Sequence, residues 1–232
     1  MSDTINLSKG SNVNLTKTAP GVGRFVIGLG WNPNPQNPPD LDASAFPCAK
    51  DASGDPKLIS PASSSFVFYG NHHSADGAIH HGGDNLTGDG EGDDERILIE
   101  TGNLNPTVDE IIIAVTIHEA AARNQNFGLV RNAYVRVYDA AALEAAEGRG
   151  WNVKAVEDDG TKNGVILSDA DLKALAIANY DLEEDAGGAT ALQFGTFYKK
   201  DGDFRFKALG VPAAASLADF VKLLAPAGTT VS

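Results

Sequence analysis

The segment from residue 84 to residue 95, DNLTGDGEGDDE, concentrates the side chains of this chain that are most able to do chemistry. Six of its 12 residues are carboxylates, and three glycines are interleaved among them. No lysine or arginine occurs between Lys57 and Arg96, so nothing nearby in the sequence neutralises this charge. Two unit charges 4 Å apart repel by roughly 1 kcal/mol even in bulk water. A folded loop of this composition therefore needs a bound cation, protonated carboxylates or widely separated side chains.

A second acidic element, Asp40-Leu41-Asp42, follows a proline-rich loop at residues 31–39. In an extended chain Asp40 and Asp42 point to one side, while Leu41 points to the other side, toward a core. Glycines permit tight bends and expose carbonyl oxygens, and about six to eight oxygen ligands suit Ca²⁺ better than Mg²⁺. The two acidic segments together predict a loop-built site for a hard cation.

The EF-hand is excluded as the form of this site. A loop starting at Asp89 has Asp94 where the motif requires glycine, and one starting at Asp159 ends at Ala170 where the motif requires glutamate. An acidic loop that is solvated and binds nothing is the alternative explanation of the charge.

Alternating apolar patterns dominate the chain and predict the elements that must position these loops. Helical patterns are few, which favours an antiparallel β-sandwich of two sheets with a few peripheral helices, a mainly β fold. The predicted strands span residues 24–31, 65–69, 96–100, 110–118, 131–138, 191–198 and 204–209, and the predicted helices span residues 140–147, 168–178 and 213–224.

Composition narrows the classes of function further. The chain has 232 residues and a formal net charge of −13, which argues against direct nucleic-acid binding because such proteins concentrate basic charge. Its one cysteine, Cys48, excludes an internal disulfide framework and Cys-cluster metal sites. No stretch has the length of a membrane span. A cytoplasmic protein is the expectation.

Four of the five histidines lie between residues 72 and 81. If residues 74–77 form a hairpin turn, the four lie close together, where they either bind Zn²⁺ or Ni²⁺ or remain exposed loop histidines beside acidic loops. They are His72, His73, His80 and His81.

Several long motifs, in order along the chain, resemble the tellurium-resistance (TerD) family. The resemblance implies one domain over residues 1–232, a β-sandwich with two clustered Ca²⁺ ions, and a non-enzymatic stress-response role linked to tellurite resistance. It also implies partners among other tellurium-resistance and stress proteins, at the inner face of the membrane. The motifs are LSKGSNVNLTKTAP (7–20), GLGW (28–31), DLDASAF (40–46), FVFYGN (66–71), GDNLTGDGEGDDE (83–95), VTIHEAAARNQNFGLVRNAYVRV (115–137) and YDLEEDAGGATALQFGTFYK (180–199).

By motif position, the resemblance implies which residues hold the metal ions. Glu119 departs from the family, which often has aspartate at that position. The implied ligands are Asp40, Asp42, Asp84, Gly88, Asp89, Glu91, Asp93, Asp94 and Glu95, with Asn71, Asn85 and Glu119 as further candidates.

A second departure is an insertion at roughly residues 139–177, where the family segment is usually shorter; we expect it to form an α/β lobe beside the sandwich.

Two other functions remain open. One is a metal-dependent hydrolase acting on phosphoesters, with His81 or His118 as general base. The other is a Ca²⁺-dependent membrane adaptor like a C2 domain.

Overall fold

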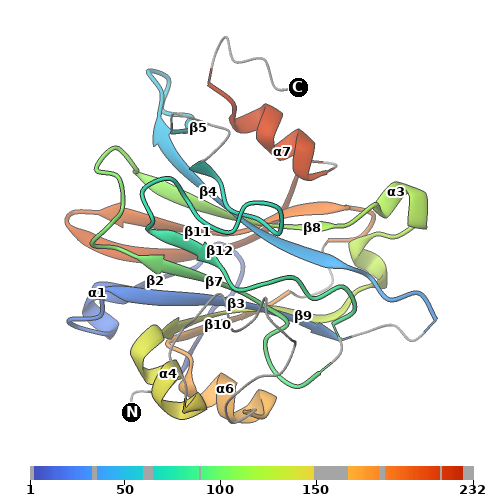
Figure 1. The fold of residues 1–232 in the computed structure, drawn as a ribbon, viewed down its shortest axis with the longest axis horizontal. Helices are drawn as coiled ribbons and strands as arrows, with labels where there is room; N and C mark the ends of the chain where they lie inside the picture. The colour runs from blue at the N-terminus through green and yellow to red at the C-terminus, as the bar shows by residue number, and fades with distance from the viewer. Residues whose placement is uncertain are drawn as a thin grey trace.

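Two six-stranded sheets pack face to face in the computed structural model (Figure 1). The structure describes residues 3–32, 36–59, 65–88, 90–148, 167–182, 186–214 and 216–226. The mainly β sandwich predicted from the sequence is therefore confirmed.

The first sheet has the strand order β1-β10-β9-β3-β7-β6. All its pairings are antiparallel except that of β1 with β10. Its strands are β1 (Ile5–Asn6), β3 (Arg24–Asn32), β6 (Ile79–His81), β7 (Glu95–Glu100), β9 (Arg131–Asp139) and β10 (Ala178–Asp181).

The second sheet has the order β2-β12-β11-β8-β4-β5 and is antiparallel throughout. Strands β11 and β12 form the hairpin expected from the sequence. The strands are β2 (Asn12–Asn14), β4 (Leu41–Lys50), β5 (Pro56–Leu58), β8 (Glu110–Ile117), β11 (Ala191–Lys200) and β12 (Asp203–Ala214).

The core lies between the sheets, as the alternating patterns require. Phe25, Ile27 and Leu29 of β3 face it, and so do Ile111 and Ile113 of β8. The intervening residues of β8 pack on the other face of the second sheet, in a cluster with Phe46 and Phe220 under a C-terminal helix. Strand β8 is apolar on both faces for this reason.

Short helices cover the outside of the sandwich. Helices α4 and α6 pack on the outer face of the first sheet, where Leu143 and Leu172 contact a cluster with Tyr138 (Figure 1). Asp139 and Ser168 cap these two helices by accepting hydrogen bonds from backbone N–H groups. The helical elements are α1 (Leu15–Thr18), α3 (Ala120–Arg123), η1 (Phe127–Leu129), α4 (Ala140–Glu147), α6 (Asp169–Leu175) and α7 (Leu217–Leu224).

Three predicted elements differ from the structure. Residues 65–69 form only isolated bridges, because the chain turns back after Phe68, which pairs with Asn71. The helix predicted at 168–178 ends at Leu175 because strand β10 begins at Ala178. The helix predicted at 213–224 begins at Leu217 because β12 continues to Ala214.

The predicted insertion at 139–177 is described only at its two ends, by α4 and α6. Residues 149–166 lie outside the described residues, together with the turn expected at Asp158-Asp159-Gly160. Among the helices of the described segments, none is long and apolar enough to span a bilayer.

Candidate metal centre

Asp40, Asp42 and Asp84 form the one cluster of potential metal ligands found among the described residues. One carboxylate oxygen from each lies within 4.8 Å of the others. Asp40 immediately precedes β4, Asp42 is its second residue, and Asp84 lies in the loop that follows β6. Leu41 between the two aspartates is buried in the core, as the alternation predicted.

Glu95 links the two acidic segments. It is the first residue of β7, and only 2 % of its surface is exposed. One carboxylate oxygen, Oε2, accepts a hydrogen bond of 2.7 Å from the backbone N–H of Ala43, and Oε1 accepts one of 3.3 Å from that of Asn85. The carboxylate thus holds the 84–95 loop against the start of β4.

Burial and mutual repulsion disfavour the charged forms of these carboxyl groups. Burial, reinforced by the charges of Glu95, Asp40 and Asp84, raises the pKa of Asp42 from 3.8 to about 8. Burial and the charge of Asp84 likewise raise the pKa of Asp40. Glu95 has a strongly raised pKa because it is fully buried. Near neutral pH the cluster therefore requires either bound protons or a cation.

Two basic side chains of the described residues approach the cluster but do not complete it. Nδ1 of His118 is 3.5 Å from Oδ2 of Asp42, and Nη1 of Arg123 is 3.6 Å from Oδ2 of Asp40. Both distances exceed those of strong charge-assisted hydrogen bonds. Within the described residues, Oδ1 of Asp40 is buried and has no hydrogen-bond partner.

The donor set fits a hard divalent cation. Oxygens on opposite sides of a Ca²⁺ ion bound at about 2.3–2.6 Å lie up to about 5 Å apart. Separations of up to 4.8 Å within the cluster are close to this range, so small side-chain movements bring all three aspartates onto one ion. Asp40 and Asp42 are buried while Asp84 is exposed, so the site is open on one side.

Asp93, a predicted ligand, belongs to a different network. Its Oδ2 accepts a 2.9 Å hydrogen bond from Nε of Arg96, and its Oδ1 accepts one of 2.9 Å from the hydroxyl of Tyr138. Nη1 of Arg96 also donates to Glu147 of α4 at 2.7 Å. These contacts join the acidic loop to the outer helix α4, on the side of the first sheet away from its core face.

Asp94 and Asn85 shape the backbone of the loop. Asp94 accepts hydrogen bonds from the backbone N–H of Trp31 at 2.9 Å and from Nδ2 of Asn85 at 3.0 Å. Oδ1 of Asn85 accepts from the backbone N–H of Gly88. Gly88 has a φ of +69°, and a Cβ there would lie 2.3 Å from Nε1 of Trp31. The site therefore needs glycine at this position for both its conformation and its space.

Among the described residues, Glu91 and Glu119 are not members of the carboxylate cluster. Glu91 and Glu119 are exposed, and Glu119 pairs with Arg123 at 3.6 Å. Asn71 donates its side-chain N–H to the carbonyl of Phe66. Asp89 lies outside the described residues.

The histidines pair across the predicted hairpin. Nδ1 of His73 lies 2.9 Å from Nδ1 of His80, and the rings of His72 and His81 are 5.6 Å apart. His81 is fully buried, and burial lowers its pKa to about 4. Its Nδ1 accepts from the backbone N–H of Gly83, and its Nε2 lies 3.5 Å from Glu95. The ring of His81 thus lies beside the carboxylate of Glu95. Because the ring is fully buried, it is poorly placed to act as a general base.

The structure also adds residues that sequence reasoning missed. Arg123 approaches Asp40 from a helix 83 positions along the chain, and no local pattern indicates this contact. His118, a candidate general base in the hydrolase hypothesis, lies with Nδ1 3.5 Å from Oδ2 of Asp42, a contact that the sequence does not predict. The carbonyl of Asp40 accepts the backbone N–H of His118 at 2.8 Å, a pairing that follows only from the register of β4 on β8.

The fold and the carboxylate cluster define a β-sandwich protein with an acidic site between its two sheets, and known proteins share this fold. The family model of the TerD domain matches residues 3–169 and 162–223. A tellurium resistance protein TerD from Alcaligenes sp is 39 % identical over 219 residues, which cover 93 % of this chain and 94 % of the relative. The chain belongs to the TerD family.

One further relative is similar in sequence, and one solved structure is similar in fold. General stress protein 16U from Bacillus subtilis (strain 168) is 37 % identical over 89 % of this chain and 90 % of the relative. The crystal structure of a homologue of telluride resistance protein (TerD) from Streptomyces coelicolor A3(2) superposes with a TM-score of 0.58 at 23 % identity. It covers 89 % of this chain and 100 % of that chain, and it supports the fold.

Proposed function

We propose that this chain is a non-enzymatic calcium-binding protein of the stress response, linked to tellurite resistance. The observation that carries the calcium assignment is the convergence of Asp40, Asp42 and Asp84, two of them buried, with Oδ1 of Asp40 lacking a partner among the described residues. The link to stress and tellurite rests on the names of relatives that match over nine-tenths of the chain.

Each carboxylate has a distinct part in this proposal. Asp40 and Asp42 supply oxygens from the start of β4, which sets their spacing before any ion arrives. Asp84 supplies an oxygen from the loop, so ion binding draws the loop toward β4. Glu95 positions both segments through its hydrogen bonds to Ala43 and Asn85. A Ca²⁺ ion, when bound, neutralises charge that burial and repulsion otherwise make costly.

A second ion remains part of the proposal. Its remaining implied ligands include Glu91 in the exposed part of the loop and Asp89, which is not among the described residues. Titration calorimetry gives the stoichiometry directly.

We test the assignment by titrating the full chain, freed of metal by chelation, with Ca²⁺ and separately with Mg²⁺ and Zn²⁺. Ca²⁺ should bind most tightly, because the site offers oxygen ligands only and has an open side. Asp84→Asn should weaken Ca²⁺ binding by about tenfold or more, since one carboxylate charge is lost from the site. Asp171→Asn, an exposed carboxylate at the start of α6, is the matched control.

Absence of Ca²⁺ binding at millimolar concentration would refute the proposal, and so would equal binding by the Asp84→Asn variant.

The proposed location is the cytoplasm, with other tellurium-resistance and stress proteins as partners at the inner membrane face. Cross-linking in cells, with and without a calcium chelator, tests whether such partners depend on the ion.

A further inference from the structure

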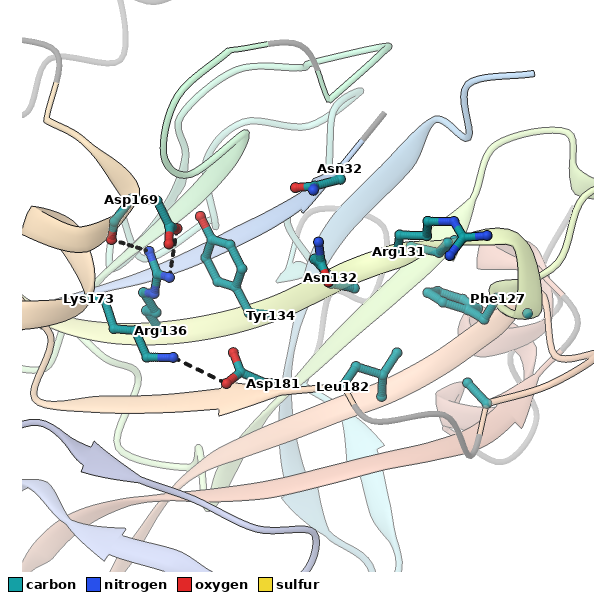
Figure 2. A pocket seen from close by; sticks show the side chains of 14 residues that line it. Asn32, Phe127, Arg131, Asn132, Tyr134, Arg136, Asp169, Lys173, Asp181 and Leu182 are labelled. Carbon is teal, nitrogen blue, oxygen red and sulfur yellow. Dashed lines mark hydrogen bonds and ion pairs between the residues drawn. The ribbon is translucent and has the colours of Figure 1, made fainter. Parts of the chain in front are cut away.

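A cavity of about 1170 Å³ lies away from the carboxylate cluster, where strand β9 begins (Figure 2). Strands β9 and β10, helix α6 and the end of β3 all contribute to its walls. Pockets for small molecules typically measure about 300–1000 Å³. The cavity is therefore large enough to hold a whole metabolite.

An irregularity in β9 directs polar side chains into this cavity. Gly30 pairs with Tyr134 and Asn32 pairs with Arg131, so β9 has one extra residue relative to β3 at this point. Asn132, within the bulge, has a φ of +51°, a left-handed conformation that asparagine adopts more readily than most residues with a side chain. Bulges of this kind commonly re-aim side chains beside functional sites. Here Arg131, Asn132 and Tyr134 all line one cavity.

Tyr134 lines the cavity and is closely packed by its neighbours. The guanidinium of Arg136 lies 3.8 Å from the centre of its ring. On its other side the ring lies against Gly30, where a Cβ would be 2.2 Å from the tyrosine hydroxyl. The hydroxyl is buried and has no hydrogen-bond partner among the described residues. Burial and the charge of Asp93 raise the pKa of Tyr134, so the hydroxyl remains protonated and able to donate.

The basic groups of the cavity differ in their pairing. Arg136 donates to Asp169 at 2.7 Å, and Lys173 pairs with Asp181 at 3.3 Å, as Figure 2 shows. Arg131 is exposed and takes part in none of the ion pairs among the described residues. A guanidinium at the wall of a cavity, without an ion pair to any described residue, stands out in a chain with a net charge of −13. Its planar fork matches phosphate and carboxylate oxygens.

We propose that this cavity binds a small polar metabolite carrying one anionic oxygen group, a phosphate or a carboxylate. Arg131 binds the anionic group. The amides of Asn32 and Asn132 bind the polar body of the molecule, and an oxygen that enters the base of the cavity accepts a hydrogen bond from Tyr134. The proposal is independent of the calcium site, because the two sites share no residue.

The test uses the full chain in buffer without divalent cations and four probes: ribose 5-phosphate, gluconate, inorganic phosphate and ribose. Binding is followed by titration and by the amide signals of Arg131 and Asn132 in NMR spectra. Ribose 5-phosphate or gluconate should bind at millimolar concentration or below and should bind more tightly than ribose; which of the two binds identifies the anionic group. Inorganic phosphate should bind more weakly than ribose 5-phosphate, because it lacks the polar body.

Two variants and one control separate binding from structure. Arg131→Gln should weaken the binding of the anionic probe by about 10- to 100-fold, as expected for loss of a charge-assisted contact. Tyr134→Phe should weaken it by about three- to tenfold without lowering the melting temperature of the free protein. Lys200→Gln removes the same charge from an exposed strand end of the other sheet and should leave binding unchanged.

Three results would overturn the proposal. One is that neither anionic probe binds at millimolar concentration. Another is that ribose binds as tightly as the anionic probes. The last is that Arg131→Gln binds them as tightly as the wild-type chain.

Discussion

Replacing Asp42 by asparagine should stabilise the metal-free protein at pH 8 and reduce its response to calcium. In the folded chain the pKa of Asp42 is about 8, and in the unfolded chain it returns to about 3.8. Between these pH values the folded state binds a proton that the unfolded state has lost. The contribution of Asp42 to stability is therefore fully present below pH 3.8 and is lost as pH rises through 8.

The size of this effect follows from the two pKa values. They differ by about four pH units, and each unit corresponds to about 1.4 kcal/mol, which gives a ceiling of about 6 kcal/mol. Asparagine keeps the shape of the protonated acid but carries no charge at any pH. Without metal, Asp42→Asn should match the wild-type chain near pH 4 and exceed it in stability at pH 8.

Calcium should reverse this advantage. Saturating the wild-type site at about 100 times its dissociation constant adds about 2.7 kcal/mol. For a chain of this size, each kcal/mol raises the melting temperature by about 2–4 °C, so the expected rise is about 5–10 °C. Asp42→Asn loses one ligand charge, and its rise should be less than half of that.

Scanning calorimetry at pH 4 and pH 8, in chelator and in Ca²⁺, measures all these quantities. Asp201→Asn is the matched control, because it removes a carboxylate from the exposed β11–β12 turn, where asparagine tolerates the φ of +54°. The reasoning fails if Asp42→Asn is less stable than the wild-type chain at pH 8 in chelator. It also fails if the variant keeps the full calcium response.

Three further changes test the packing around the site. Arg96→Met leaves the buried carboxylate of Asp93 without its ion pair and should cost about 3–5 kcal/mol in urea unfolding; a loss below about 1 kcal/mol would contradict the assigned network. Gly88→Ala should destabilise the fold by about 1–3 kcal/mol and weaken calcium binding, because its Cβ would overlap Trp31 and its φ is positive. Phe46→Ala should lower the free energy of unfolding by about 3–5 kcal/mol. Its calcium affinity should equal that of the Asp201→Asn control. An unchanged unfolding midpoint would argue against the cluster under α7.

The local elements could largely be predicted from the sequence because each strand must bury one face or both. Strand β3 alternates core residues with glycines, and β8 is apolar on both faces, and both were recognised from these patterns. The prediction of a strand at residues 65–69 is wrong. A run of aromatic residues fits the strand pattern, but it can bury its rings equally well when the chain forms a turn. There Phe66 stacks on Phe68 at 4.9 Å between ring centres.

The sequence by itself determined that two anionic segments exist, that they contain no basic residue, and that glycine lets one of them bend. Only the tertiary structure decided which carboxylates meet. The consecutive residues Asp93, Asp94 and Glu95 reach three different partners: Arg96, the backbone N–H of Trp31, and that of Ala43. Successive side chains leave an extended chain in opposite directions, so their partners depend on what each layer of the sandwich brings near them. Sheet pairing across distant segments sets those neighbours, and local sequence does not encode them.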